Sequence, residues 1–120
     1  MLITIYKRRG TTEEVTFKDK NGDALALNAG DVVRVKIGRQ GSTPILDIAS
    51  NTSLAGGTTI QKGSEPYNPV NLIFAPSDLT SITPGLYDVE ALVVDSADSN
   101  RPKHAEMGVC QVIETQQGST

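Results

Sequence analysis

The residues best suited to chemistry in this sequence lie in two short acidic stretches. In the first, Asp19, Asn21 and Asp23 stand at positions one, three and five of a calcium-binding loop. The rest of that pattern fails, because Gly22 falls at position four and Gly30, not a carboxylate, at position twelve. Asn-Gly is also a strong signal of a tight hairpin turn. The sequence therefore predicts a turn here and no metal site.

The second acidic stretch runs from Asp95 to Asn100 and includes Asp98. It lacks the glycine that gives a calcium loop its sharp turn. We interpret it as part of a solvated loop over Asp95–Lys103, with a weak ion site as the alternative.

His104 and Cys110 are the only histidine and the only cysteine. A serine or cysteine triad would have to use His104, yet the sequence holds no Gly-x-Ser-x-Gly elbow. Both residues fall in one predicted strand, which separates them by roughly 20 Å at about 3.3 Å per residue. No phosphate-loop or dinucleotide fingerprint occurs either. We therefore expect a protein that is not an enzyme and holds no cofactor, with Cys110 as a buried apolar side chain.

Composition indicates a single globular domain. The 120 residues are 38% hydrophobic with a net charge of -3, which suits one core and gives no reason to expect nucleic acid. No apolar run approaches the roughly 20 residues of a membrane span, and the N-terminus lacks the features of a secretory signal. One cysteine permits no internal disulfide, as expected for synthesis in a reducing cytoplasm. We expect one domain over residues 1–114 and a flexible tail over 115–120.

Apolar and polar residues alternate with period two along most of the chain, as they do in half-buried strands. The longest alternation follows Pro84-Gly85 and runs to about Asp95, with a return strand over His104–Ile113. One segment, Ala75–Thr83, could form a helix of one or two turns with Ser77 as its cap. The other predicted strands are Leu2–Lys7, Glu13–Lys18, Leu25–Leu27, Val33–Ile37, Ile45–Ile48, Thr58–Gln61 and Val70–Phe74.

Short strands, closely spaced turns and almost no helix predict an all-β fold. The prediction is an immunoglobulin-like antiparallel β-sandwich of about seven to nine strands with one short helical turn. Tyr87 stands where such sandwiches place a tyrosine corner, and the alternative is an ordinary strand tyrosine. The residues predicted to be buried between the sheets are Phe17, Val33, Val35, Ile37, Leu72, Phe74, Val89, Ala91 and Val112.

The outward phase of the last two strands is unusually apolar. It carries Leu86, Leu92 and Val94 on one strand and Val109 and Ile113 on the next. Neighbouring strands would join these side chains into a patch, and monomers rarely leave such patches open. We therefore predict that an identical subunit or another protein covers it. The alternative is that residues 77–83 or the N-terminal strand fold over it.

A series of turn and strand motifs occurs in a characteristic order. The series is Asp19-Lys20-Asn21-Gly22-Asp23 with Leu25 and Leu27, Val33-x-Val35-x-Ile37, Leu79-x-x-x-x-Pro84-Gly85-x-Tyr87, Val93-x-Asp95 and Gly108-x-x-x-Val112. This series, spanning about Leu2 to Ile113, resembles the immunoglobulin-like domain of tailed-phage baseplate proteins. The resemblance is greatest to the N-terminal domain of the upper-baseplate type that anchors receptor-binding proteins. The chain departs from that family in the Asp95–Lys103 loop, where the family has an Asp-Gly turn.

The resemblance implies a non-enzymatic virion structural protein of the tail, baseplate or capsid surface. Such a protein is synthesised in the host bacterial cytoplasm, resides in the virion and acts through interfaces with other virion proteins. The family usually continues into a helical or fibre-forming segment where this chain ends, so we expect a free-standing component, homo-oligomeric or docked on a larger protein.

The alternative function is a carbohydrate- or host-surface-binding module of the same fold. The sequence contains no tryptophan, so Tyr6, Tyr67 and Tyr87 would have to supply the aromatic rings of such a site.

Overall fold

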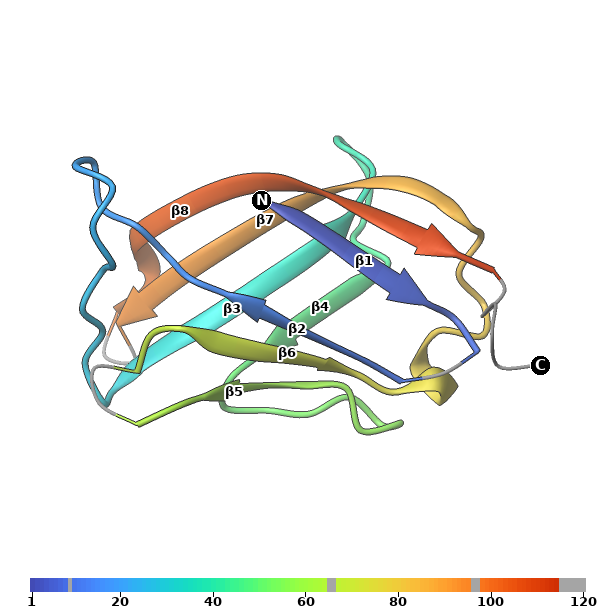
Figure 1. Cartoon of the computed structure of the whole chain (residues 1–120), viewed down its shortest axis with the longest axis horizontal. Helices are drawn as coiled ribbons and strands as arrows, with labels where there is room; N and C mark the ends of the chain where they lie inside the picture. The colour runs from blue at the N-terminus through green and yellow to red at the C-terminus, as the bar shows by residue number, and fades with distance from the viewer. Residues whose placement is uncertain (9, 65–66, 96–97, 115–120) are drawn as a thin grey trace.

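The computed structural model of the chain describes residues 1–8, 10–64, 67–95 and 98–114, the side chains of 98–101 excepted. It is a sandwich of two β-sheets (Figure 1). The strands are β1 (Leu2–Tyr6), β2 (Thr11–Val15), β3 (Asp31–Gly38), β4 (Leu46–Ala49), β5 (Thr59–Lys62), β6 (Val70–Phe74), β7 (Gly85–Asp95) and β8 (Asp98–Ile113). The expected tail over 115–120 lies outside the described residues.

The strand order is that of an immunoglobulin-like sandwich. One sheet has the order β1-β8-β7-β3-β4 and the other the order β2-β6-β5. This matches the division of immunoglobulin domains into a sheet built around the last two strands and a smaller opposing sheet. One pairing departs from the antiparallel prediction, because β1 runs parallel to β8. The all-β sandwich predicted from the sequence is therefore confirmed.

The core fills the space between the two sheets. β3 alternates buried and more exposed residues along its length, and Val33, Val35 and Ile37 point inward. β6 and β7 show the same alternation, with Phe74 and Val89 buried. All nine residues predicted to be buried are buried. Period-two patterning is sufficient to identify them, because a shift by one residue would turn every side chain of a strand to the other face.

The β7–β8 hairpin is longer than predicted. The expected loop Asp95–Lys103 is largely strand, because β8 already begins at Asp98. Pairing shifts at its end: Val93 lies opposite His104, Val94 opposite Pro102, and Asp95 opposite Asp98. Bulges of this kind absorb extra residues without ending the ladder, so a proline and a polar run remain compatible with a strand.

The predicted short helical turn is confirmed, but its extent over Ala75–Thr83 and its Ser77 cap are wrong. Only the 3-10 turn η1 (Pro76–Asp78) forms, and the side chain of Ser77 does not cap it. Leu79 and Ile82 follow and are buried in the core. Their burial draws the segment into the sandwich, and this stabilises it more than further helical turns would.

A tyrosine corner follows this segment. The hydroxyl of Tyr87 donates a hydrogen bond to the carbonyl oxygen of Thr83, four residues upstream. This is the arrangement that joins the corner to a late strand in immunoglobulin-like sandwiches. The corner interpretation of Tyr87 is confirmed over the ordinary strand tyrosine.

No helix in the described part of the chain is long and apolar enough to cross a membrane.

Candidate protein interface

The outer face of the five-stranded sheet carries a group of exposed apolar side chains. Ile3 and Cys110 are fully buried, so their neighbours Leu2 and Val109 point outward, and the parallel register places these two side by side. On β7, Tyr87 points inward and Leu86 outward. The exposed fractions are 67% for Leu2, 62% for Leu86, 65% for Met107 and 42% for Val109. We call these four residues the outer strip.

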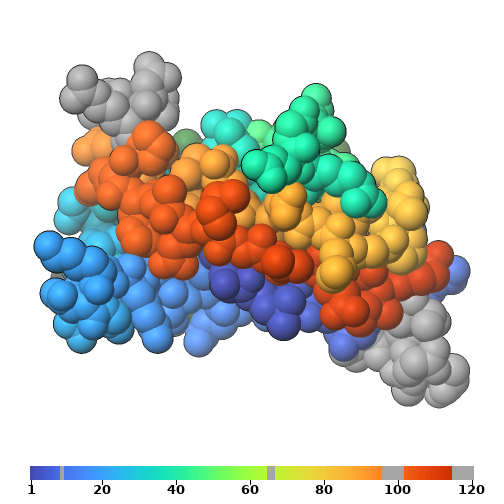
Figure 2. All heavy atoms as spheres, turned by 90° about the horizontal axis from the view of Figure 1, so that it is seen from above, coloured from blue at the N-terminus to red at the C-terminus, as the bar shows by residue number. Residues whose placement is uncertain are grey.

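The register makes the outer strip continuous. Val109 lies beside Leu2 on one side and opposite Asp88 on the other, and Leu86 is the next outward residue of β7. Met107 precedes Val109 by two residues on the same face of β8. Figure 2 looks onto this face, where β8 lies between the N-terminal strand and β7.

The structure divides the five residues predicted to form the patch. Leu86 and Val109 belong to the outer strip. Leu92 and Ile113 are half-buried, and Val94 is only 6% exposed. The prediction therefore places the patch on the correct face but extends it too far along β7.

Leu2 and Met107 were missed by sequence reasoning. The alternation of Leu2 with Ile3 and Ile5 predicts its outward phase but not that it lies beside Val109, because a parallel pairing leaves no local sequence signal. Neither proposed cover lies over the strip among the described residues. β1 is part of the same sheet, and Leu79 and Ile82 are packed in the core.

A hollow of about 500 Å³ borders the strip. Met107 lines it together with the loop over residues 39–44, which rises above the sheet beside β7 (Figure 1). The backbone N–H of Gln40 donates to Asp88 Oδ2 at 3.1 Å and ties this loop to β7. The charged residues that line the hollow are Lys36, Arg39, Asp88 and Glu90.

An ion pair between the buried Asp31 and the partly exposed Lys103 closes the far end of the β7–β8 hairpin. Asp31 is 3% exposed and accepts hydrogen bonds from Lys103 Nζ at 2.9 and 3.1 Å and from the N–H of Asn28 at 2.8 Å. Lys62 Nζ donates to the carbonyl oxygen of Asp31 at 2.6 Å and so links β5 to β3 across the two sheets. Burial opposes ionisation of Asp31, but these bonds outweigh it, so the pKa of its carboxyl lies below the usual value.

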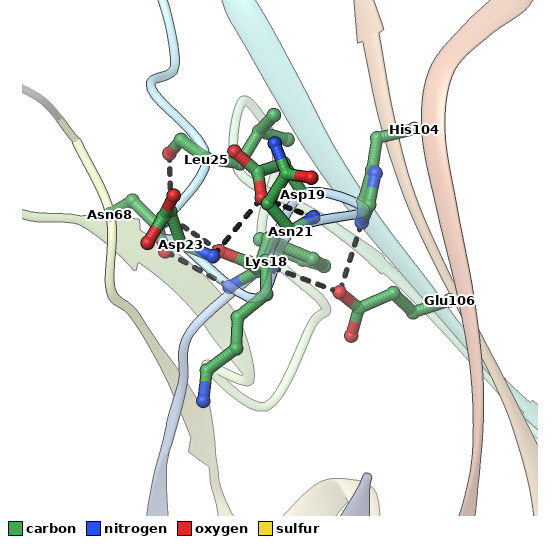
Figure 3. Close-up of polar contacts among 9 residues, drawn as sticks. Lys18, Asp19, Asn21, Asp23, Leu25, Asn68, His104 and Glu106 are labelled. Atoms are coloured by element: carbon green, nitrogen blue, oxygen red, sulfur yellow. Dashed lines mark hydrogen bonds and ion pairs between the residues drawn. The ribbon is translucent and has the colours of Figure 1, made fainter.

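A second polar group fastens the turn over residues 18–25 to β8. Glu106 Oε1 accepts from the N–H of Lys18 at 3.1 Å and lies 2.9 Å from His104 Nε2 (Figure 3). Asn68 holds the other side of this turn, because its amide donates to the carbonyl oxygens of Phe17 and Leu25 at 2.8 and 2.6 Å. These contacts bind a turn to a sheet.

The first acidic stretch forms the predicted turn. Asp19 Oδ1 accepts from the N–H groups of Asn21 and Asp23, and Gly22 adopts a φ of 86° that favours glycine. The predicted strand Leu25–Leu27 is wrong, because only the single bridge between Lys18 and Ala24 forms there. Of the second stretch, the side chains of residues 98–100 lie outside the description. Among the described side chains, no group of three His, Cys, Asp or Glu residues could hold a metal ion.

Cys110 is fully buried on the inner face of β8. Burial and the nearby charge of Glu13 raise the pKa of its thiol to about 12, so the nucleophilic thiolate is scarce at neutral pH. His104 lies on the same strand six residues away and is occupied with Glu106. These two residues do not form a catalytic dyad.

In comparisons with known proteins, the sequence matches no family model and no curated protein. The function is therefore inferred from the geometry of the outer strip and from the sequence motifs.

Proposed function

We propose that the chain is a non-enzymatic structural protein of a bacteriophage particle that acts through protein–protein interfaces. It would be a component of the tail, the baseplate or the capsid surface, synthesised in the cytoplasm of the host bacterium. The outer strip carries this proposal, because it presents Leu2, Leu86 and Met107 at exposures above 60% on one rigid sheet. The order of motifs from Asp19 to Val112 supplies the phage context by resemblance.

Two features of the outer strip favour an interface: its exposed apolar residues lie together, and the sheet beneath them is fixed. Single exposed apolar residues are ordinary, but contiguous ones on a face mark sites of association. The sheet beneath is fixed by β1–β8 and β7–β8 pairing and by a fully buried core, so the strip changes little in shape when a partner binds. A preordered surface loses little conformational entropy on binding, which favours association.

The carbohydrate-binding alternative receives less support from the tyrosines. Tyr87 is buried and its hydroxyl is bonded to Thr83. Tyr67 packs against the core, with the ammonium of Lys62 5.4 Å from its ring centre. Neither ring presents an open face on which a sugar could stack.

Purified phage particles provide the test. Mass spectrometry should find the chain in particles of the phage that encodes it, and Leu86→Glu should reduce its incorporation at least about tenfold, because a charge would be buried at the interface. Gln61→Glu adds the same charge at an exposed position of β5 on the opposite sheet and should incorporate normally. Circular dichroism should show both variants folded.

Two results would count against the proposal. Absence of the wild-type chain from particles would exclude a virion role. Normal incorporation of folded Leu86→Glu would show that the strip is not the interface.

A further inference from the structure

We propose that the occupant of the outer strip is a second copy of this chain, in a two-fold symmetric dimer with strip against strip. The inference rests on the proposed function only in taking the strip as an interface. It does not depend on the phage assignment. In a two-fold dimer the same patch serves both subunits, so the patch must be complementary to itself.

The charges beside the strip satisfy this requirement. Lys36 and Arg39 balance Asp88 and Glu90, and all four line the hollow next to Met107. The chain as a whole carries a net charge of -3, yet this flank is neutral. Two such flanks can meet without like-charge repulsion, and each offers acids to the other's bases. A strongly charged partner would instead call for a flank of one sign.

The shape of the face also suits a second copy. The molecule measures 42 × 31 × 29 Å, so one broad face can bury the roughly 800 Å² per partner that specific interfaces require. The loop over residues 39–44 rises beside a hollow of about 500 Å³. A two-fold axis that passes near Met107 would bring the raised loop of each copy toward the hollow of the other.

Pairing through the nearest sheet edge is disfavoured. β1 is the edge strand on this side of the sheet, and two of its N–H groups are already bonded to side chains of β2. The N–H of Thr4 donates to Glu13 Oε1 at 3.0 Å, and that of Tyr6 donates to Thr11 Oγ1 at 3.1 Å. An edge with two of its donors already bonded is a poorer template for another strand. Association on this side of the molecule is therefore directed to the face.

Sedimentation velocity of the purified chain tests the dimer. Over a hundredfold range of concentration, the wild type should shift from a species of 12.8 kDa to one of twice that mass. Leu86→Glu and Met107→Glu should each weaken dimerisation at least about tenfold, because each buries an unpaired charge in the interface. Met107→Glu also brings two like charges together near the axis. Gln61→Glu should dimerise as the wild type does.

A charge-pairing experiment tests the two-fold symmetry of the dimer. Met107→Glu and Met107→Lys should each be largely monomeric alone, whereas an equal mixture should dimerise, because near the two-fold axis opposite charges meet within a Debye length of about 8 Å. A wild type that stays monomeric throughout would overturn the proposal. So would a dimer that is insensitive to both strip variants.

Experiments on phage particles distinguish failure of the dimer proposal from failure of the proposed virion function. If the wild type is monomeric but Leu86→Glu is lost from particles, the strip meets a different protein and only the dimer is excluded. If the strip-dependent dimer forms but the chain is absent from particles, the dimer holds and the virion role is excluded.

Discussion

The two ends of the β7–β8 hairpin differ in how far the rest of the chain contacts them. At the end that holds Val94, polar contacts close the inner side of the sheet: the buried Asp31 pairs with the partly exposed Lys103, and Glu106 accepts from the N–H of Lys18. At the end that holds Leu86, the outward residues stay exposed. Both ends show a similar apolar alternation in sequence, so alternation indicates a face but not whether that face is open.

The difference shows where the chain needs a partner. Polar contacts from distant segments close one end, and they fix a single arrangement by their geometry. At the other end the outer strip presents apolar side chains beside charged ones such as Asp88, and apolar contacts are non-directional and accept any complementary surface. Three changes test this contrast, in order of decreasing effect.

Val94→Glu should produce the largest effect. Val94 is 6% exposed, so the new carboxylate would be buried, and we expect a loss of at least about 3 kcal/mol in the free energy of unfolding. Leu86→Glu, on the same face and strand, should change it by no more than about 0.5 kcal/mol. Urea unfolding measures both. Similar losses for the two variants would mean that the two ends do not differ in burial.

Asp31→Asn should lower the free energy of unfolding by an intermediate amount. It should also remove the part of that free energy that depends on the ionisation of Asp31. Lys103 is partly exposed, so solvent screening reduces the contribution of the pair to about 1–3 kcal/mol at pH 7. The pKa of folded Asp31 lies below its usual value of 3.8, so this stability is complete above that value and declines as pH falls through the folded pKa.

Urea unfolding of Asp31→Asn and wild type at pH 7, 4.5 and 3 measures the expected convergence. Asp47 and Asp78 also have lowered pKa values, but they titrate in both proteins and cancel in the difference. A difference that stays constant to pH 3 would show that the charge of Asp31 does not stabilise the closed end.

Tyr87→Phe should have the smallest effect, at the open end. It leaves the ring buried and removes only the hydrogen bond to the carbonyl of Thr83, at a cost of about 1 kcal/mol. Thermal unfolding should show a lower midpoint, while sedimentation should show unchanged dimerisation. Weakened dimerisation would mean that the corner also shapes the outer strip.

Local pattern was enough to predict most of the fold. Period two in β3, β6 and β7 identified the core, and Pro84-Gly85 before Tyr87 identified the corner, because these features depend on neighbouring residues. The short helical turn was predicted, but its extent over 75–83 was wrong, because burial of Leu79 and Ile82 depends on a core that local sequence does not contain. The early start of β8 at Asp98 was missed for the same reason, since it depends on pairing with β7.

The candidate site was predicted only in part. The exposure of Leu86 and Val109 could be predicted from the period-two alternation of their strands. Leu2 joins them through a parallel pairing between the first and last strands, which the alternation does not reveal. Val94 was assigned to the patch because alternation continues through it, yet it is only 6% exposed, in a hollow that Val32 and Arg34 also line. Burial on an outer face depends on which distant segments lie there, and sequence phase alone does not contain that information.

The parallel pairing of β1 with β8 has a mechanical consequence. Leu2 lies beside Val109 and Tyr6 beside Ile113, so both strands point the same way (Figure 1). Tension applied between Met1 and Ile113 would slide the two strands along each other. Evenly spaced parallel hydrogen bonds would then share the load together and not break one after another. A chain held at both ends in a larger assembly would resist stretching through this one ladder.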